Sequence, residues 1–274
     1  IINLKESFLS KIDKKNFSQF KYLAMGTFIT GLAGVITIFY VRLLIEDNLG
    51  LEKLGIFDAA WTLGTIYVVF LLSSFGTYVL PTLSSIKGKK ELDIFLNQTI
   101  NITFLLFVPI VITMITFKEY FILIFYSKDF LESIQILHML LIGDAFKILS
   151  WVFGMLFLAK NKMLPFVFLS LFWDIIFLGS IILFIEEYSI DSITYGYIFT
   201  QLLYLIITTL IVKKIFCINI SLKTISFLII SSITIGLFAY FNKEEINIYL
   251  FLLFILMWSV ISYVNLKKSK YNDK

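Results

Sequence analysis

The chain has 274 residues, of which 59% are hydrophobic, 18% aromatic and 15% charged, and its formal net charge is +4. Its mean hydropathy of +0.93 lies far above the range of soluble domains, so the composition predicts an all-α, polytopic membrane protein without a soluble catalytic domain. The single His138 and the single Cys217 provide neither an internal disulfide nor a credible zinc site. We therefore expect no metal and no cofactor.

Eight apolar runs each approach the length of about 20 residues that a helix needs to cross the hydrocarbon of a bilayer. They cover residues 22–45, 56–80, 98–117, 134–158, 164–185, 193–212, 224–241 and 247–266. Residues 1–21 mix lysines with apolar residues, which predicts an amphipathic cytoplasmic linker. Residues 118–133 are too apolar for a free loop and too short to cross, so we expect them at the membrane interface. Pro81 is expected to end the second span.

The basic residues predict which side of the membrane each end occupies, because positive residues in short loops stay on the cytoplasmic side. With a cytoplasmic N-terminus, the inner segments hold 17 Lys or Arg residues and the outer loops hold 4. Eight spans then place both termini inside. The chain begins at Ile1 with no leader pattern, so we expect it to be a piece of a longer protein.

Ionisable residues occur inside two neighbouring predicted spans. Asp144 and Lys147 lie near the middle of the fourth span, and Asp174 lies in the fifth. Because a charge at the bilayer centre costs roughly 3 kcal/mol or more on insertion scales, such groups normally face a partner or water. Asp144 and Lys147 share a helix face, and Trp151 lies about 20° from Asp144 on that face. Lys147 and Asp174 are equidistant from the link between the spans, so we expect them to be able to meet.

These charges allow two interpretations. They either form a buried network that locks two helices together, or they contact a substrate or carry a coupling proton, since two acids and one base leave a spare acid. Arg42 and Asp58 are equidistant from residue 50 and are expected to pair in the outer half of the first hairpin. Arg42 either extends to the interface or offers its guanidinium to a diphosphate.

Three stretches carry a resemblance to a known family. They are YVLPTLSSIK at 78–87, IFYSKDF at 124–130 and LIGDAFKILSWVFGMLFLAK at 141–160. Together they resemble the C-terminal half of the Wzx-type O-antigen and common-antigen flippases, in the polysaccharide transporter branch of the multidrug/oligosaccharidyl-lipid/polysaccharide exporter superfamily. The resemblance implies that residues 22–214 form the second of two six-helix bundles. Residues 215–274 would add two membrane helices and a basic cytoplasmic tail.

The resemblance also implies a function. It implies a flippase, not an enzyme, which moves a polyprenyl-diphosphate-linked oligosaccharide across the bacterial inner membrane by alternating access, for the biosynthesis of O-antigen or another surface polysaccharide. The expected partners are this lipid, the membrane and the N-terminal bundle of the same parent protein. Lys147 and Arg42 would supply cations to the path. The candidate substrate-binding or coupling residues are Lys147, Asp144, Arg42, Asp174 and Trp151.

Two other functions fit parts of the sequence. A cation-coupled multidrug exporter of the same fold would need unpaired acids in its cavity, whereas Lys147 is placed to neutralise Asp144. A membrane-embedded polysaccharide enzyme would need a large outer loop or a catalytic cluster, and the longest outer segment is residues 118–133. The sequence shows no phosphate-binding loop and no basic soluble face, so we expect neither a nucleotide nor a nucleic acid as partner.

Overall fold

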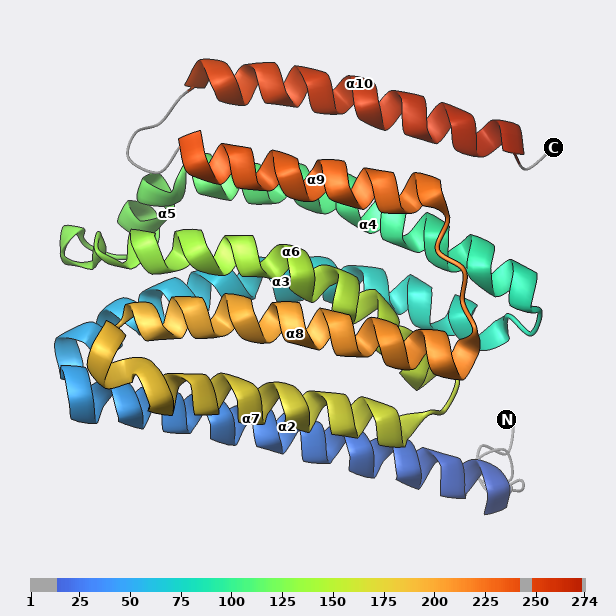
Figure 1. Ribbon diagram of the computed structural model, residues 1–274, viewed down its shortest axis with the longest axis horizontal. Helices are drawn as coiled ribbons and strands as arrows, with labels where there is room; N and C mark the ends of the chain where they lie inside the picture. The colour runs from blue at the N-terminus through green and yellow to red at the C-terminus, as the bar shows by residue number, and fades with distance from the viewer. Residues whose placement is uncertain (1–13, 242–247, 273–274) are drawn as a thin grey trace, which may run out of the picture.

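The structure is a computed structural model that describes residues 14–241 and 248–272 as a bundle of long helices (Figure 1). The helices are α2 (Lys14–Leu49), α3 (Leu51–Ser85), α4 (Lys89–Thr116), α5 (Lys118–Phe125), α6 (Ser133–Ala159), α7 (Met163–Tyr188), α8 (Asp191–Phe216), α9 (Leu222–Phe241) and α10 (Ile248–Asn272), with a 3-10 turn at Lys128–Phe130. Those two ranges contain no strand. The predicted all-α, polytopic fold class is confirmed.

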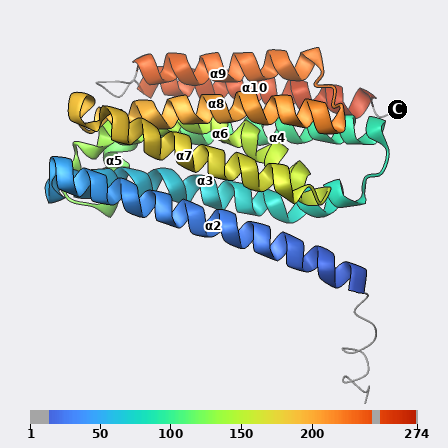
Figure 2. The ribbon, with the colours of Figure 1, turned by 60° about the horizontal axis from the view of Figure 1, so that its bottom comes forward.

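Each of the eight predicted spans corresponds to one long helix. In the described part of the chain, seven helices are long and apolar enough to cross a membrane, namely α2, α3, α4, α6, α7, α8 and α9. The last helix, α10, has a shorter apolar stretch over Ile248–Ser262. Residues 14–21 of the predicted linker form the first turns of α2. The rest of that linker lies outside the described residues. In Figure 2 the first turns of α2 extend away from the other helices.

The prediction that Pro81 ends the second span is wrong, because α3 continues past it to Ser85. A proline removes a backbone hydrogen bond from a helix, but side-chain hydroxyls nearby can satisfy the carbonyl groups of the disturbed turn. The hydroxyls of Thr82 and Ser84 donate to the carbonyl oxygens of Tyr78 and Leu80, each at 2.8 Å. These bonds support the turns beside the proline and do not replace the bond to the Thr77 carbonyl that Pro81 cannot donate, yet the helix runs on for one further turn.

The helices pack in an order that differs from their order in the chain. The central helix α6 packs against α3 and α8, while α7 packs against α2 and α8. On the other side, α4 packs against α6, α9 and α10. Figure 1 shows α8 between α6 and α7. Although α6 and α7 are consecutive in the chain, they therefore have little contact with each other.

The link between α6 and α7 is a compact turn that is attached to α3. Asn161 has a φ of 55°, and the N–H groups of Lys162 and Asn161 donate to the carbonyls of Phe157 and Leu158 at 2.8 and 3.1 Å. This pair of bonds is the Schellman arrangement, in which asparagine can replace glycine. Lys160 Nζ donates to the carbonyl oxygen of Leu83 at 2.7 Å and to that of Ile86.

A cation at this place stabilises α3, since the last carbonyl groups of a helix lack intrahelical donors and carry partial negative charge. Burial lowers the pKa of the Lys160 amine. Through its two hydrogen bonds to carbonyl groups of α3 and its C-cap, Lys160 fixes the inner end of α6 to the inner end of α3. We use "inner end" for the end of the bundle with this link, and "outer end" for the opposite end with the 3-10 turn.

The predicted orientation can be tested with two cysteines at opposite ends. Cys217 is exposed between α8 and α9 at the inner end, and Ser189 is exposed between α7 and α8 at the outer end. We expect a membrane-impermeant thiol reagent to label Cys217 only after cells are permeabilised. A Cys217→Ser, Ser189→Cys variant should be labelled in intact cells. Labelling of both proteins from the same side would contradict the predicted topology.

Candidate functional site

A buried carboxyl group lies where α3, α6 and α8 meet. Asp144 of α6 has only 1% of its surface exposed. The hydroxyl of Tyr67, on α3, donates to Oδ2 of Asp144 at 2.5 Å, and the hydroxyl of Tyr197, on α8, donates to Oδ1 at 2.6 Å. One side chain thus connects three helices, and we call Asp144, Tyr67, Tyr197 and Lys147 the Asp144 cluster.

Lys147 is the fourth member of this cluster, but its ammonium group does not make a close contact with the Asp144 carboxylate. Its Nζ lies 3.8 Å from Asp144 Oδ1 and 3.4 Å from the hydroxyl oxygen of Tyr197, and 5.9 Å from the centre of the Tyr197 ring. The Lys147 side chain is 33% exposed, whereas that of Asp144 is 2% exposed. The predicted pairing of the two residues on one helix face is therefore observed. The Lys147 side chain thus keeps an exposed part outside the cluster.

The space inside the cluster is small. A cavity of about 10 Å³ lies between Asp144, Lys147, Tyr197 and Trp61, which is close to the minimum volume that one water molecule requires. The Trp61 ring packs edge-on to the Tyr197 ring with centroids 5.8 Å apart. The cluster itself therefore holds no more than a small polar molecule, and any larger ligand has to meet Lys147 from its exposed side.

Asp174 does not meet Lys147, so this expectation from the sequence is wrong. Asp174 is buried on α7, beside Thr37 of α2 and near Tyr204 of α8. Within the described ranges it forms no ion pair. The expectation assumed that consecutive helices pack side by side, but α8 separates α6 from α7. Tyr197 of α8 takes the position beside Lys147 that we had expected Asp174 to occupy.

Arg42 forms the predicted pair with Asp58, with Arg42 Nε 2.8 Å from Asp58 Oδ1. The two side chains are 43% and 37% exposed, so the pair contributes at most about 1 kcal/mol to stability. It connects α2 to α3. In the described part of the chain no hydrogen bond or ion pair joins Arg42 to Lys147, so the structure shows two separate charged groups rather than one site.

Trp151 packs against α3 rather than joining the Asp144 cluster. A Cβ atom at Gly76 would lie 3.5 Å from the indole ring of Trp151, and the ring is half-buried against the apolar core. Sequence reasoning missed Tyr67, Tyr197 and Trp61, since nothing in an apolar run distinguishes these aromatic residues from their neighbours. The only available signal was indirect, namely that a buried acid requires donors at its own depth.

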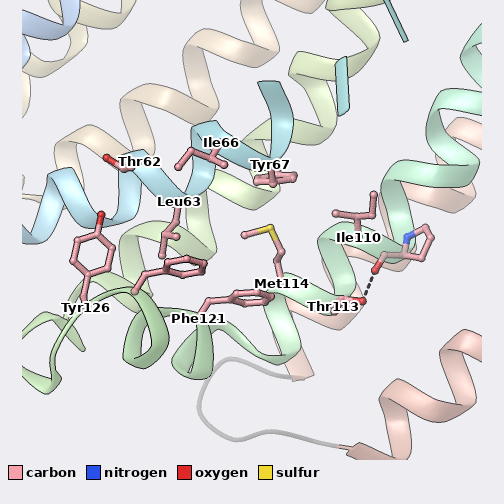
Figure 3. Close-up of a pocket in the computed structure, with 11 residues that line it drawn as sticks. Thr62, Leu63, Ile66, Tyr67, Ile110, Thr113, Met114, Phe121 and Tyr126 are labelled. Carbon is pink, nitrogen blue, oxygen red and sulfur yellow. Dashed lines mark hydrogen bonds between the residues drawn. The ribbon is translucent and has the colours of Figure 1, made fainter. Parts of the chain in front are cut away.

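An apolar cavity of about 680 Å³ lies on the other side of Tyr67, between α3, α4 and α5. Figure 3 shows the residues of α3 facing those of α4 and α5 across this space. The Thr113 hydroxyl is turned to the Pro109 carbonyl at 2.7 Å, so it is already engaged. The lining includes Thr62, Leu63, Ile66, Tyr67, Ile110, Met114, Phe121 and Tyr126. Tyr67 thus lines an apolar cavity and also bonds to the buried acid.

Comparison with known proteins gives the class of this bundle. Residues 2–135 match the family model described as a polysaccharide biosynthesis protein. The chain is 23% identical over 146 residues to the lipid III flippases of Escherichia coli (strain K12) and Shigella flexneri, which covers 53% of this chain and 34% of each relative. It is 22% identical over 139 residues to a Shigella flexneri protein named as a candidate O-antigen transporter, covering 50% of this chain and 33% of that relative. No solved structure matches the chain significantly.

The helical bundle and these matches define a multi-pass membrane protein related to polysaccharide biosynthesis proteins. More particularly, the matches confirm the resemblance to the Wzx-type polysaccharide flippase family. The aligned part spans about a third of the length of the curated relatives.

Gly143 allows Tyr197 to reach Asp144. A Cβ atom at Gly143 would lie 2.6 Å from Cε1 of the Tyr197 ring, so Gly143→Ala must displace that ring and its bond to the acid. We expect this change to lower the free energy of unfolding by about 1–3 kcal/mol, measured by denaturation in detergent. Gly154→Ala is the control on the same helix, since its nearest side chain, Phe166, lies at 3.8 Å. Equal stability of the two variants would contradict the close packing of Tyr197.

Proposed function

We propose that the chain is the C-terminal part of a flippase that moves a lipid-diphosphate-linked oligosaccharide across the bacterial inner membrane for the biosynthesis of a surface polysaccharide. The observation that carries this proposal is the partly exposed Lys147 side chain within the membrane-spanning α6. The relatives named lipid III flippase and candidate O-antigen transporter support it.

The chemistry of such a substrate requires a cation inside the membrane. A diphosphate and its sugars do not enter hydrocarbon, so they need a polar path with positive charge. Lys147 offers three N–H donors as a compact charge, and Tyr197 holds it at 3.4 Å and is itself held by Asp144. Asp144 therefore positions the cation through Tyr197, while the exposed side of Lys147 receives phosphate oxygens.

Transport would proceed by alternating access. The N-terminal bundle of the parent protein would form the opposite wall of a central path, and movement of the two bundles would expose Lys147 first to the inner and then to the outer side. Within this chain, the bonds from Asp144 to Tyr67 and Tyr197 keep α3, α6 and α8 together during that movement. The three helices would thus move as one body.

The arrangement around Asp144 favours an anionic substrate over the cationic substrate of a drug exporter. Both carboxylate oxygens already accept hydrogen bonds from buried tyrosines, and Asp144 has 1% of its surface exposed. A cationic drug would need an acid that it can reach. The exposed member of the cluster is instead the lysine.

The role of Lys147 can be tested in a full-length parent protein. We expect Lys147→Met to abolish display of the surface polysaccharide while the amount of protein stays normal, because methionine retains an unbranched apolar side chain but has no charge for a diphosphate. Surface polysaccharide and protein level are measured in the same cells. Lys128→Met, on the exposed 3-10 turn, is the control and should transport normally. Normal display with Lys147→Met would remove this residue from the substrate path.

A further inference from the structure

A second polar cavity lies at the outer end of the bundle and includes none of the residues of the Asp144 cluster. Its volume is about 460 Å³, which is within the usual range for small-ligand sites. It is formed where α5, α6 and α8 begin. The polar and aromatic residues that line it are Lys118, Glu132, Gln135, His138, Asp191, Thr194 and Tyr195. We call it the outer cavity.

One wall of the outer cavity carries buried nitrogen donors. Lys118 of α5 and His138 of α6 are both 8% exposed, and Lys118 Nζ lies 3.2 Å from His138 Nδ1. The two nitrogens are within hydrogen-bond distance of each other. Burial lowers the pKa of the Lys118 amine. The pair thus places two polar nitrogen groups in the lining of the cavity, next to apolar residues such as Leu131 and Met139.

Other residues in the lining carry acceptors. Gln135 Nε2 lies 3.4 Å from Asp191 Oδ1, at the long limit for a hydrogen bond, so both side chains retain capacity for another partner. Glu132 forms an ion pair with Lys53. Tyr195 is 54% exposed and presents its ring to the same space. A ligand in the outer cavity would therefore meet donors, acceptors and one flat aromatic surface together.

The balance of charge selects the type of ligand. Two carboxyl groups and one ammonium group line the outer cavity, so a diphosphate would meet acids and an organic cation would meet Lys118. In the described ranges no group of three or more possible metal-binding residues occurs. A sugar ring fits better, because each hydroxyl group both donates and accepts and the ring has apolar C–H faces that can pack on tyrosine.

We propose that the outer cavity binds a neutral sugar ring of the transported glycan at the outer side of the membrane. The identity of the ligand rests on the proposed flippase function, but the site is separate from Lys147. Sugar binding here would hold the glycan at the outer side after Lys147 has released the diphosphate, and so disfavour its return. For rapid release the binding must be weak, in the millimolar range of dissociation constants, which corresponds to about −4 kcal/mol.

Saturation-transfer NMR on the purified 274-residue chain in lipid nanodiscs tests this site directly. The probes are free glucose, galactose and N-acetylglucosamine at millimolar concentration, and inorganic pyrophosphate is added as a competitor. We expect saturation transfer to the ring protons of at least one sugar, and no competition by pyrophosphate. Tyr195→Ala should reduce the signal at least threefold. Tyr120→Ala is the matched control, since Tyr120 on α5 is 56% exposed and does not line the outer cavity.

A second variant separates the outer cavity from its neighbour. Tyr195 also borders a cavity between α7 and α8, whereas Gln135 lines the outer cavity and does not line that neighbour. Gln135→Leu should therefore also reduce the signal at least threefold, and it keeps the test valid if Tyr195→Ala does not fold. The proposal is overturned by the absence of signal from all three sugars, by an unchanged signal in Gln135→Leu, or by displacement with pyrophosphate.

This measurement requires no transport, so it separates the two proposals. Sugar binding that depends on Gln135 would support the outer cavity even if Lys147→Met proved to transport normally. Loss of transport in Lys147→Met, together with no sugar binding, would support the proposed function and overturn the outer cavity.

Discussion

The need to satisfy one buried carboxyl group determines much of this bundle. Asp144 lies inside an apolar helix where neither water nor lipid provides donors, so its hydrogen bonds must come from neighbouring helices. Tyr67 and Tyr197 supply them at 2.5 and 2.6 Å. To do so, α3 and α8 must lie on either side of α6, and position 143 must be a glycine so that the Tyr197 ring can approach. The packing of the three helices and the position of the acid therefore depend on each other.

The same bonds connect the different environments that an amphiphilic ligand would meet. Tyr67 has its ring on the apolar cavity between α3, α4 and α5, and its hydroxyl on Asp144. The hydroxyl of Tyr197 donates to Asp144 and accepts from the Lys147 ammonium. The proposed diphosphate contact at Lys147 and the apolar cavity thus lie on opposite sides of one hydrogen-bonded unit. A ligand or substitution at either place would therefore affect α3, α6 and α8 together.

Much of the fold could be predicted from the sequence, because span length and composition suffice to locate membrane helices. The Arg42–Asp58 pair could be predicted as well, since the two helices form a hairpin and residues equidistant from its turn lie at one depth. The same reasoning failed for Lys147 and Asp174, because α8 lies between their helices, and contacts between distant segments leave no local signal. Tyr67 and Tyr197 were missed for this reason too. Asp144 could be singled out in the sequence as a buried acid, but its partners Tyr67 and Tyr197 could be identified only from the helix packing.

The central claim is that Asp144 joins α3 to α6 through the hydroxyl of Tyr67. A double-mutant cycle with Tyr67→Phe and Asp144→Leu measures it most directly, using the free energy of unfolding in mixed detergent micelles. If the bond is made as described, the two changes should not add, and the coupling energy should be about 1–3 kcal/mol. Additive effects, with a coupling energy below about 0.5 kcal/mol, would contradict the account.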